Sequence, residues 1–155
     1  MKSTALLEAQ AVKAYYSTRQ GYIKAVDNID LTIDKNMTLG VAGESGCGKS
    51  TLMNTLMMNV KPPLHLMEGT IVLDGKVISK MSRYELKNNV WGVLVSLVPQ
   101  SALNALMPTK RIIDFITDVI HHHTDVSISE ITSRAKKRFE ELNLPGDSLS
   151  MYPHE

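Results

Sequence analysis

The sequence contains a single cysteine, Cys47, so no disulfide can form within the chain and no oxidising compartment is indicated. Basic and acidic residues nearly balance at 17 and 16, and the formal charge of +1 gives no electrostatic reason to expect a nucleic-acid partner. No apolar run approaches the roughly 20 residues of a membrane-spanning helix. Glu8 and Gln10 interrupt the N-terminal apolar patch, which is not typical of a secretory signal. These absences leave an ordinary globular composition in a chain of 155 residues, a length that suits about one domain.

Hydrophobic periodicity predicts alternating strands and helices. Residues 26–33 alternate apolar and polar, as a half-buried strand does, whereas residues 37–42 and 93–98 are continuously apolar, as in strands buried on both faces. Asp74-Gly75 between two short apolar runs predicts a hairpin. Helices are predicted from residue 49 to Pro62-Pro63, over residues 83–89 and 110–121, and from Ser127 or Ser129 to Pro145-Gly146.

Residues 43–50 read GESGCGKS and satisfy the pattern G-x-x-x-x-G-K-[S/T] in full. Glycines let the main chain approach a phosphate closely, and successive N–H groups then form an anion nest at the start of a helix. Lys49 supplies a charge for the β and γ phosphates, Ser50 a hydroxyl for Mg²⁺ and Thr51 a donor for the α phosphate. The motif therefore predicts a nucleotide triphosphate site that binds Mg·ATP. The residues expected to contact it are Gly43, Ser45, Gly46, Cys47, Gly48, Lys49, Ser50 and Thr51.

Three strings together resemble the ATP-binding subunits of ABC transporters, in the dipeptide/oligopeptide importer branch. They are GESGCGKST at residues 43–51, GTIVLDGKVISKMSRYELK at residues 69–87 and LVPQSALNALMP at residues 97–108. The likeness covers residues 11–155, and the final MYPHE resembles the run that precedes the LSGG signature in this branch. It implies an α/β fold: a P-loop NTPase core of the ABC ATPase type with an antiparallel β region and the start of a helical subdomain. Residues 1–100 would form the nucleotide-binding core, and residues 101–155 the Q-loop and the first part of the helical subdomain.

The resemblance assigns two further site residues. Gln100 stands where the family has its Q-loop glutamine, which serves catalysis together with Lys49 and reaches Mg²⁺, as Ser50 does. Tyr16 stands where the family has an aromatic residue that stacks on adenine, although Tyr15 and Tyr22 are close alternatives. The branch often has an acidic residue and a proline after the glutamine. Residues 101 and 102 are serine and alanine here, which puts any contact of that acidic residue in doubt.

Several motifs that ATP hydrolysis needs in this family are not found in the sequence. They are the Walker B aspartate with its catalytic glutamate, the signature and the switch histidine. We therefore expect a piece of a longer polypeptide, or a poorly stable fragment, that does not hydrolyse ATP alone. Without the second half of the fold, the apolar surface around residues 37–42 is expected to be uncovered.

The function implied by the resemblance is that of an ABC-type ATPase that drives uptake through an importer. The implied partners are a second ATP-binding subunit, two transmembrane permease subunits and, indirectly, an extracellular substrate-binding protein, with the chain peripheral on the cytoplasmic face of the membrane. The alternatives are a soluble ABC-type ATPase not linked to transport, a P-loop GTPase and a simple nucleotide-binding module. No Asn-Lys-x-Asp string supports the GTPase. The sequence does not identify the transported substrate.

Overall fold

The computed structural model describes residues 5–99 and 105–155. The chain divides into two compact units, residues 1–91, here the sheet unit, and residues 92–155, here the helical unit. In the part of the chain that the structure describes, no helix is both long and apolar enough to span a membrane.

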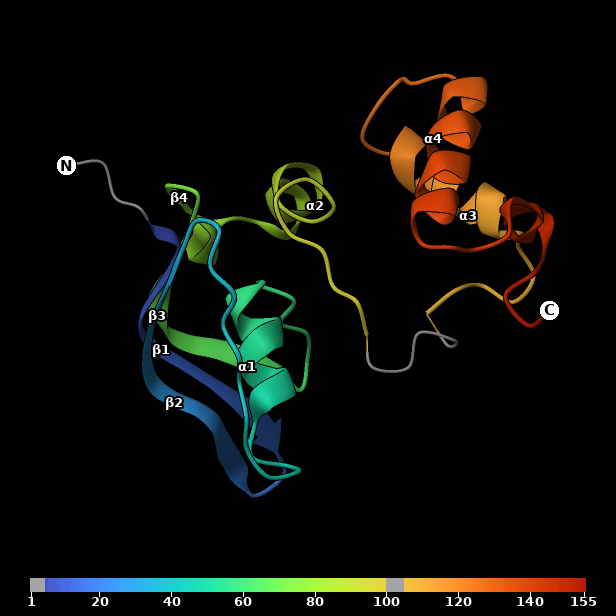
Figure 1. The fold of residues 1–155 in the computed structure, drawn as a ribbon. Coiled ribbons are helices and arrows are strands. Elements are labelled where there is room, and N and C mark those ends of the chain that lie inside the picture. The colour runs from blue at the N-terminus through green and yellow to red at the C-terminus, as the bar shows by residue number, and fades with distance from the viewer. Residues whose placement is uncertain (1–4, 100–104) are drawn as a thin grey trace. The chain divides into compact units, whose positions relative to one another are not determined.

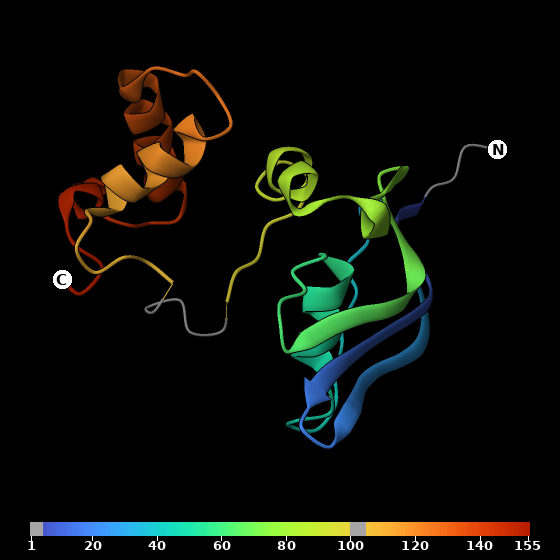
Figure 2. The ribbon, with the colours of Figure 1, turned by 180° about the vertical axis from the view of Figure 1, so that it is seen from behind.

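The sheet unit contains one four-stranded sheet in the order β2-β1-β3-β4, and all neighbouring strands are antiparallel. Helix α1 (Lys49–Leu56) packs against β1 and β2, and Figures 1 and 2 show it along one side of the sheet. The predicted antiparallel β region is therefore present. The strands are β1 (Ala5–Thr18), β2 (Gly21–Asp34), β3 (Leu64–Leu73) and β4 (Lys76–Val77).

An irregularity in the middle of β1 determines which of its side chains face the core. The register with β2 shifts between Ala9 and Val12, and the register with β3 shifts between Gln10 and Lys13. Within this stretch Ala11 has a positive φ of 49° and donates its N–H to Asp30 Oδ1 at 2.8 Å. Gly69 of β3 approaches so closely here that a Cβ on it would lie 2.5 Å from Val12 Cα. This β-bulge moves the buried positions of the strand by one residue. The buried side chains of β1 are Leu7, Ala9, Val12 and Ala14.

The sequence predicted the local elements of this unit well. The strand over residues 26–33 lies within β2, and the helix from residue 49 is α1. The helix ends at Leu56, earlier than the predicted end at Pro62-Pro63. Asp74 and Gly75 have φ of 46° and 78° and connect β3 to β4, as a hairpin turn of that composition should. Helix α2 (Arg83–Asn89) begins with a full capping box, in which Ser82 and Glu85 each accept the other's backbone N–H.

The prediction of a doubly buried strand at residues 37–42 is wrong for this structure. These residues form no strand, and Met37, Leu39 and Val41 are 66%, 46% and 53% exposed. A strand needs a hydrogen-bonded neighbour, and the described residues supply none for this segment. Leu39 and Val41 instead line a cavity of about 410 Å³ with apolar side chains of β2 and α1. The expectation that this apolar surface is uncovered therefore holds.

The helical unit contains α3 (Ile112–His121), α4 (Ile128–Glu141) and the 3₁₀ helix η3 (Gly146–Ser150). Ser127 caps α4 by accepting the N–H of Glu130 at 3.3 Å, as predicted. Ile131, Ala135 and Leu149 are buried where these helices meet. Leu142, the residue that follows α4, is 67% exposed. The predicted strand at residues 93–98 is also wrong. The segment has no strand, and Val98 is 85% exposed.

Candidate phosphate-binding site

The loop over residues 43–48 takes a conformation that requires glycine at two positions. Gly46 and Gly48 have φ of 84° and 97°, in the left-handed region that other residues seldom adopt. Gly48 also passes so close to β2 that a Cβ on it would lie 2.8 Å from the carbonyl oxygen of Ala25. The backbone path of the loop therefore accounts for Gly48 of the motif, and for Gly46 at one of the positions that the motif leaves open.

The loop ends at the N-terminus of α1, which carries uncompensated positive partial charge. Gly48 is the N-cap residue and has no side chain to cap the helix, and the first turn contains no acidic residue. The N–H of Leu52 donates to Gly48 O at 2.8 Å, so the amides before it precede the i→i−4 ladder. Free amides together with the helix dipole form a binding site suited to an anion.

The ammonium group of Lys49 lies within the loop. Its Nζ donates to the carbonyl oxygens of Gly43 and Glu44, both at 2.7 Å, and lies 3.6 Å from Cys47 Sγ. Both oxygen partners are neutral main-chain groups and no carboxylate is among them. A positive charge therefore stands beside the amides at the head of α1, where a polyphosphate would need it.

The two hydroxyl residues after Lys49 differ in their surroundings. Ser50 is exposed, so its hydroxyl is open to a ligand or a metal ion. Thr51 is only 9% exposed, and its Oγ1 lies 3.0 Å from the phenol oxygen of Tyr16 in β1. The carbonyl of Thr51 accepts the buried hydroxyl of Thr55 at 2.8 Å. Thr51 thus joins α1 to the sheet through its contact with Tyr16.

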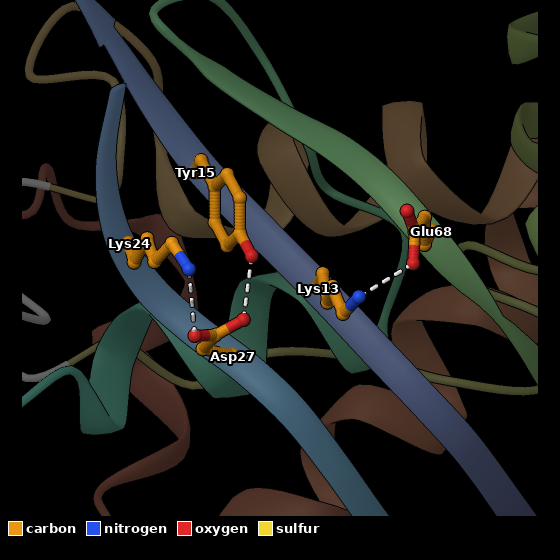
Figure 3. Close-up of polar contacts among 5 residues, drawn as sticks. All are labelled: Lys13, Tyr15, Lys24, Asp27 and Glu68. Carbon is orange, nitrogen blue, oxygen red and sulfur yellow. Dashed lines mark hydrogen bonds and ion pairs between the residues drawn. The ribbon is translucent and has the colours of Figure 1, made fainter. Parts of the chain in front are cut away.

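Tyr15 and Tyr16 take opposite faces of β1, because successive side chains of a strand alternate. Tyr15 donates to Asp27 Oδ1 at 2.5 Å, and Lys24 Nζ lies 3.3 Å from Asp27 Oδ2, as Figure 3 shows. The hydrogen bond from Tyr15 is the main cause that holds the pKa of Asp27 below its ordinary value, and Asp27 in turn raises the pKa of Tyr15. Tyr22 lies against Tyr15, with ring centroids 6.5 Å apart.

The structure therefore brings together residues 43–51 and Tyr16, all within the sheet unit. Gln100, the other predicted site residue, lies outside the described residues. Sequence reasoning did not find the contact of the loop with Ala25 or the pairing of Tyr16 with Thr51. Both join positions more than 20 residues apart, so no local pattern could have indicated them.

Comparison with known proteins gives a consistent result. Residues 26–153 match the family model described as ABC transporter. The chain is 31% identical over 150 residues to the dipeptide transport ATP-binding protein DppD of Caldanaerobacter subterraneus, with 96% of this chain and 46% of that protein covered. It is 29% identical over 158 residues to the oligopeptide transport ATP-binding protein OppD of Bacillus subtilis, with 100% and 44% covered. The chain thus spans slightly less than half the length of these curated relatives.

A solved structure supports the fold. It is an ATP-binding cassette, described as a dimer in a post-hydrolysis state bound to ADP and Pi, and it superimposes with a TM-score of 0.80 at 22% identity. The match covers 96% of this chain and 62% of that one. The predicted α/β fold of the ABC ATPase type is confirmed by this likeness. Because the family model covers most of the sequence, the chain belongs to the ABC transporter family.

Proposed function

We propose that this chain binds Mg·ATP through the loop at residues 43–50 and the N-terminus of α1. The observation that carries the proposal is the positive charge and partial charge gathered at the N-terminus of α1. An uncapped helix start, a left-handed glycine turn and the Lys49 ammonium lie together, without an acidic side chain in the first turn. Such an arrangement suits a polyphosphate far better than a neutral ligand.

Each residue of the site has a distinct part in this proposal. Lys49 exchanges its carbonyl partners for the β and γ phosphate oxygens, and Ser50 offers its exposed hydroxyl to Mg²⁺. Mg²⁺, when bound, would neutralise charge on the same phosphate oxygens. The amides of residues 45–51 other than that of Cys47, which donates to Glu44 O at 3.3 Å, donate to the phosphates. Gln100 would add a ligand for Mg²⁺, a role that rests on the family resemblance alone.

Tyr16 is the tyrosine that we propose stacks on the base. Its position beside α1 supports this choice, because Thr51, the residue it contacts, follows the phosphate loop directly. Tyr15 is bonded to Asp27 and paired with the ring of Tyr22 on the other face of β1. Neither of those two tyrosines has a comparable contact with α1 among the hydrogen bonds of the described residues.

For the whole protein we propose the ATP-binding subunit of a peptide-type ABC importer, in which ATP hydrolysis drives uptake. The names of the relatives, which are transport ATP-binding proteins for dipeptides and oligopeptides, support this over an ATPase not linked to transport. The expected partners are a second ABC ATP-binding subunit and two permease subunits at the cytoplasmic face of the membrane. Residues 1–100 would bind the nucleotide, and residues 101–155 would begin the helical subdomain. Co-purification with membrane subunits tests the transport assignment.

The binding proposal is tested with Lys49→Ala and calorimetry of Mg·ATP. The variant loses a charge-assisted contact, which is worth about 1.5–3 kcal/mol and lowers the affinity about tenfold to a hundredfold. Lys87→Ala is the matched control, because it removes the same charge from an exposed position in α2. Equal affinities of Lys49→Ala and the wild type for Mg·ATP would disprove the proposal.

A further inference from the structure

The hydroxyl groups of Tyr16 and Thr51 form a pair that the proposed nucleotide chemistry does not by itself explain. A base-stacking residue needs only its flat ring, and phenylalanine or tryptophan would serve as well. Here the phenol oxygen lies 3.0 Å from Thr51 Oγ1, and Tyr16 is half-buried between the sheet and α1. The hydroxyl therefore has a defined partner in the phosphate-binding helix.

Either hydroxyl could donate the hydrogen bond between Tyr16 and Thr51, and the direction decides which proton is left over. Each hydroxyl has one proton, and a threonine hydroxyl can accept two hydrogen bonds as well as donate one. If Tyr16 donates to Thr51, the proton of Thr51 is left for another acceptor. Linked hydrogen bonds of this kind polarise and strengthen one another in a partly buried site.

Thr51 is held in place on its other side as well. Its carbonyl accepts the Thr55 hydroxyl at 2.8 Å, which fixes its main chain in α1. The residue is 9% exposed, so close packing leaves the Oγ1 little freedom to turn away from Tyr16. Thr51 also directly follows Ser50 in the first turn of α1, whose amides have no partner within the helix. An anion bound at the helix N-terminus would offer an acceptor for the Thr51 hydroxyl proton.

We propose that the Tyr16 hydroxyl is a positioning group for the polyphosphate site. It donates to Thr51 Oγ1 and so directs the Thr51 hydroxyl proton toward the phosphates of the bound nucleotide. This inference rests on the proposed function and deepens it. Tyr16 would then serve the phosphates through its oxygen, independently of any contact between its ring and the base.

The test measures binding of two probes, Mg·ATP and magnesium tripolyphosphate, to the 155-residue chain by calorimetry. Tripolyphosphate has no base, so stacking cannot contribute to its affinity. Tyr16→Phe keeps the ring and removes only the hydroxyl, and we expect it to weaken both probes by about threefold to tenfold. Tyr15→Phe is the matched control, because it removes the same atom from the neighbouring residue on the other face of β1, and both affinities should stay unchanged.

A double-variant comparison shows whether the effect passes through Thr51. Once Thr51→Val has removed the acceptor, Tyr16→Phe should weaken tripolyphosphate binding no further, whereas Thr51→Ser should restore the sensitivity. Thermal melting of every variant confirms that the loss of affinity does not follow from unfolding. Additive losses in the double variant would contradict the inference.

The two probes also separate this inference from the function on which it rests. A wild-type chain that binds neither probe counts against the proposed function, and the inference falls with it. A wild-type chain that binds both, with Tyr16→Phe binding tripolyphosphate equally well, leaves the proposed function intact and overturns the inference alone. A loss confined to Mg·ATP would place the hydroxyl at the nucleoside, which also contradicts it.

Discussion

Replacing Gly48 by alanine tests whether the loop over residues 43–48 must pass close to β2. A Cβ at this position would lie 2.8 Å from the carbonyl oxygen of Ala25, and the backbone φ is 97°. The left-handed conformation costs a non-glycine residue about 1–2 kcal/mol. The contact with a main-chain oxygen adds about 1–3 kcal/mol, as overpacking does, because neither atom can rotate away. Gly46→Ala is the matched control, since Gly46 has a φ of 84° but open space around its Cβ position.

We therefore expect Gly48→Ala to lower the free energy of unfolding by about 2–5 kcal/mol and Gly46→Ala by about 1–2 kcal/mol. Both changes restrict the unfolded chain equally, so that contribution cancels in the difference between them. Each kcal/mol shifts the Tm by about 2–4 °C in a protein of this size. The fluorescence of Trp91 follows the sheet unit, because it is the only tryptophan in the sequence and its indole N–H donates to Met57 O at 2.8 Å.

The comparison of the two glycine variants shows whether the close approach of Gly48 to Ala25 affects stability. Equal losses of stability would show that the loop moves away from Ala25 without difficulty, and the close approach would then have no energetic significance. The same ranking is expected for Mg·ATP affinity, because Gly48 is the N-cap residue of α1 and its displacement moves the amides that follow.

Three further predictions concern other parts of the chain. Ser82→Ala removes the N-cap of α2, so hydrogen exchange of the α2 amides should quicken as expected for a loss of about 1 kcal/mol. Ile131→Ala opens a cavity in the helical unit and should cost about 2–5 kcal/mol in urea unfolding, whereas Leu142→Ala at an exposed position should stay within about 0.5 kcal/mol. Tyr15→Phe should return the pKa of Asp27 toward its ordinary value, as followed by NMR titration. Because that pKa is lowered in the folded state, the stabilisation is complete above the ordinary carboxyl pKa and is lost as the pH falls through the lowered one, so the variant should show a smaller loss in acid.

The features that the sequence predicted correctly are those determined by neighbouring residues. Asp74-Gly75 forms its turn because only a few residue pairs accept two positive φ values in succession. Ser127 caps α4 through a contact three residues along the chain. The glycine-rich motif is likewise recognised from its own residues, and the structure has a loop with left-handed glycines there, followed by α1. Local chemistry of this kind can be read without knowledge of the rest of the fold.

The features that were missed depend on distant parts of the chain. Strand β1 was not predicted, because the bulge at Ala11 interrupts the alternation by which a half-buried strand is recognised. Residues 37–42 have the composition of a buried strand, but composition does not provide the neighbouring strand that would bury them. The pairing of Tyr16 with Thr51 joins positions 35 residues apart, and only the folded sheet reveals it.

The bulge in β1 also decides which of two adjacent tyrosines lies beside α1 and contacts Thr51. If β1 kept all its residues but ran without the bulge, Leu7 and Val12, which are five positions apart, would face opposite sides of the sheet. Either the first half of the strand would turn its apolar residues outward, or the second half would exchange Tyr15 for Tyr16 beside the helix. The loss of one codon beyond the bulge, such as that of Lys13, would therefore change the surroundings of Thr51 while every letter of the glycine-rich motif stayed the same.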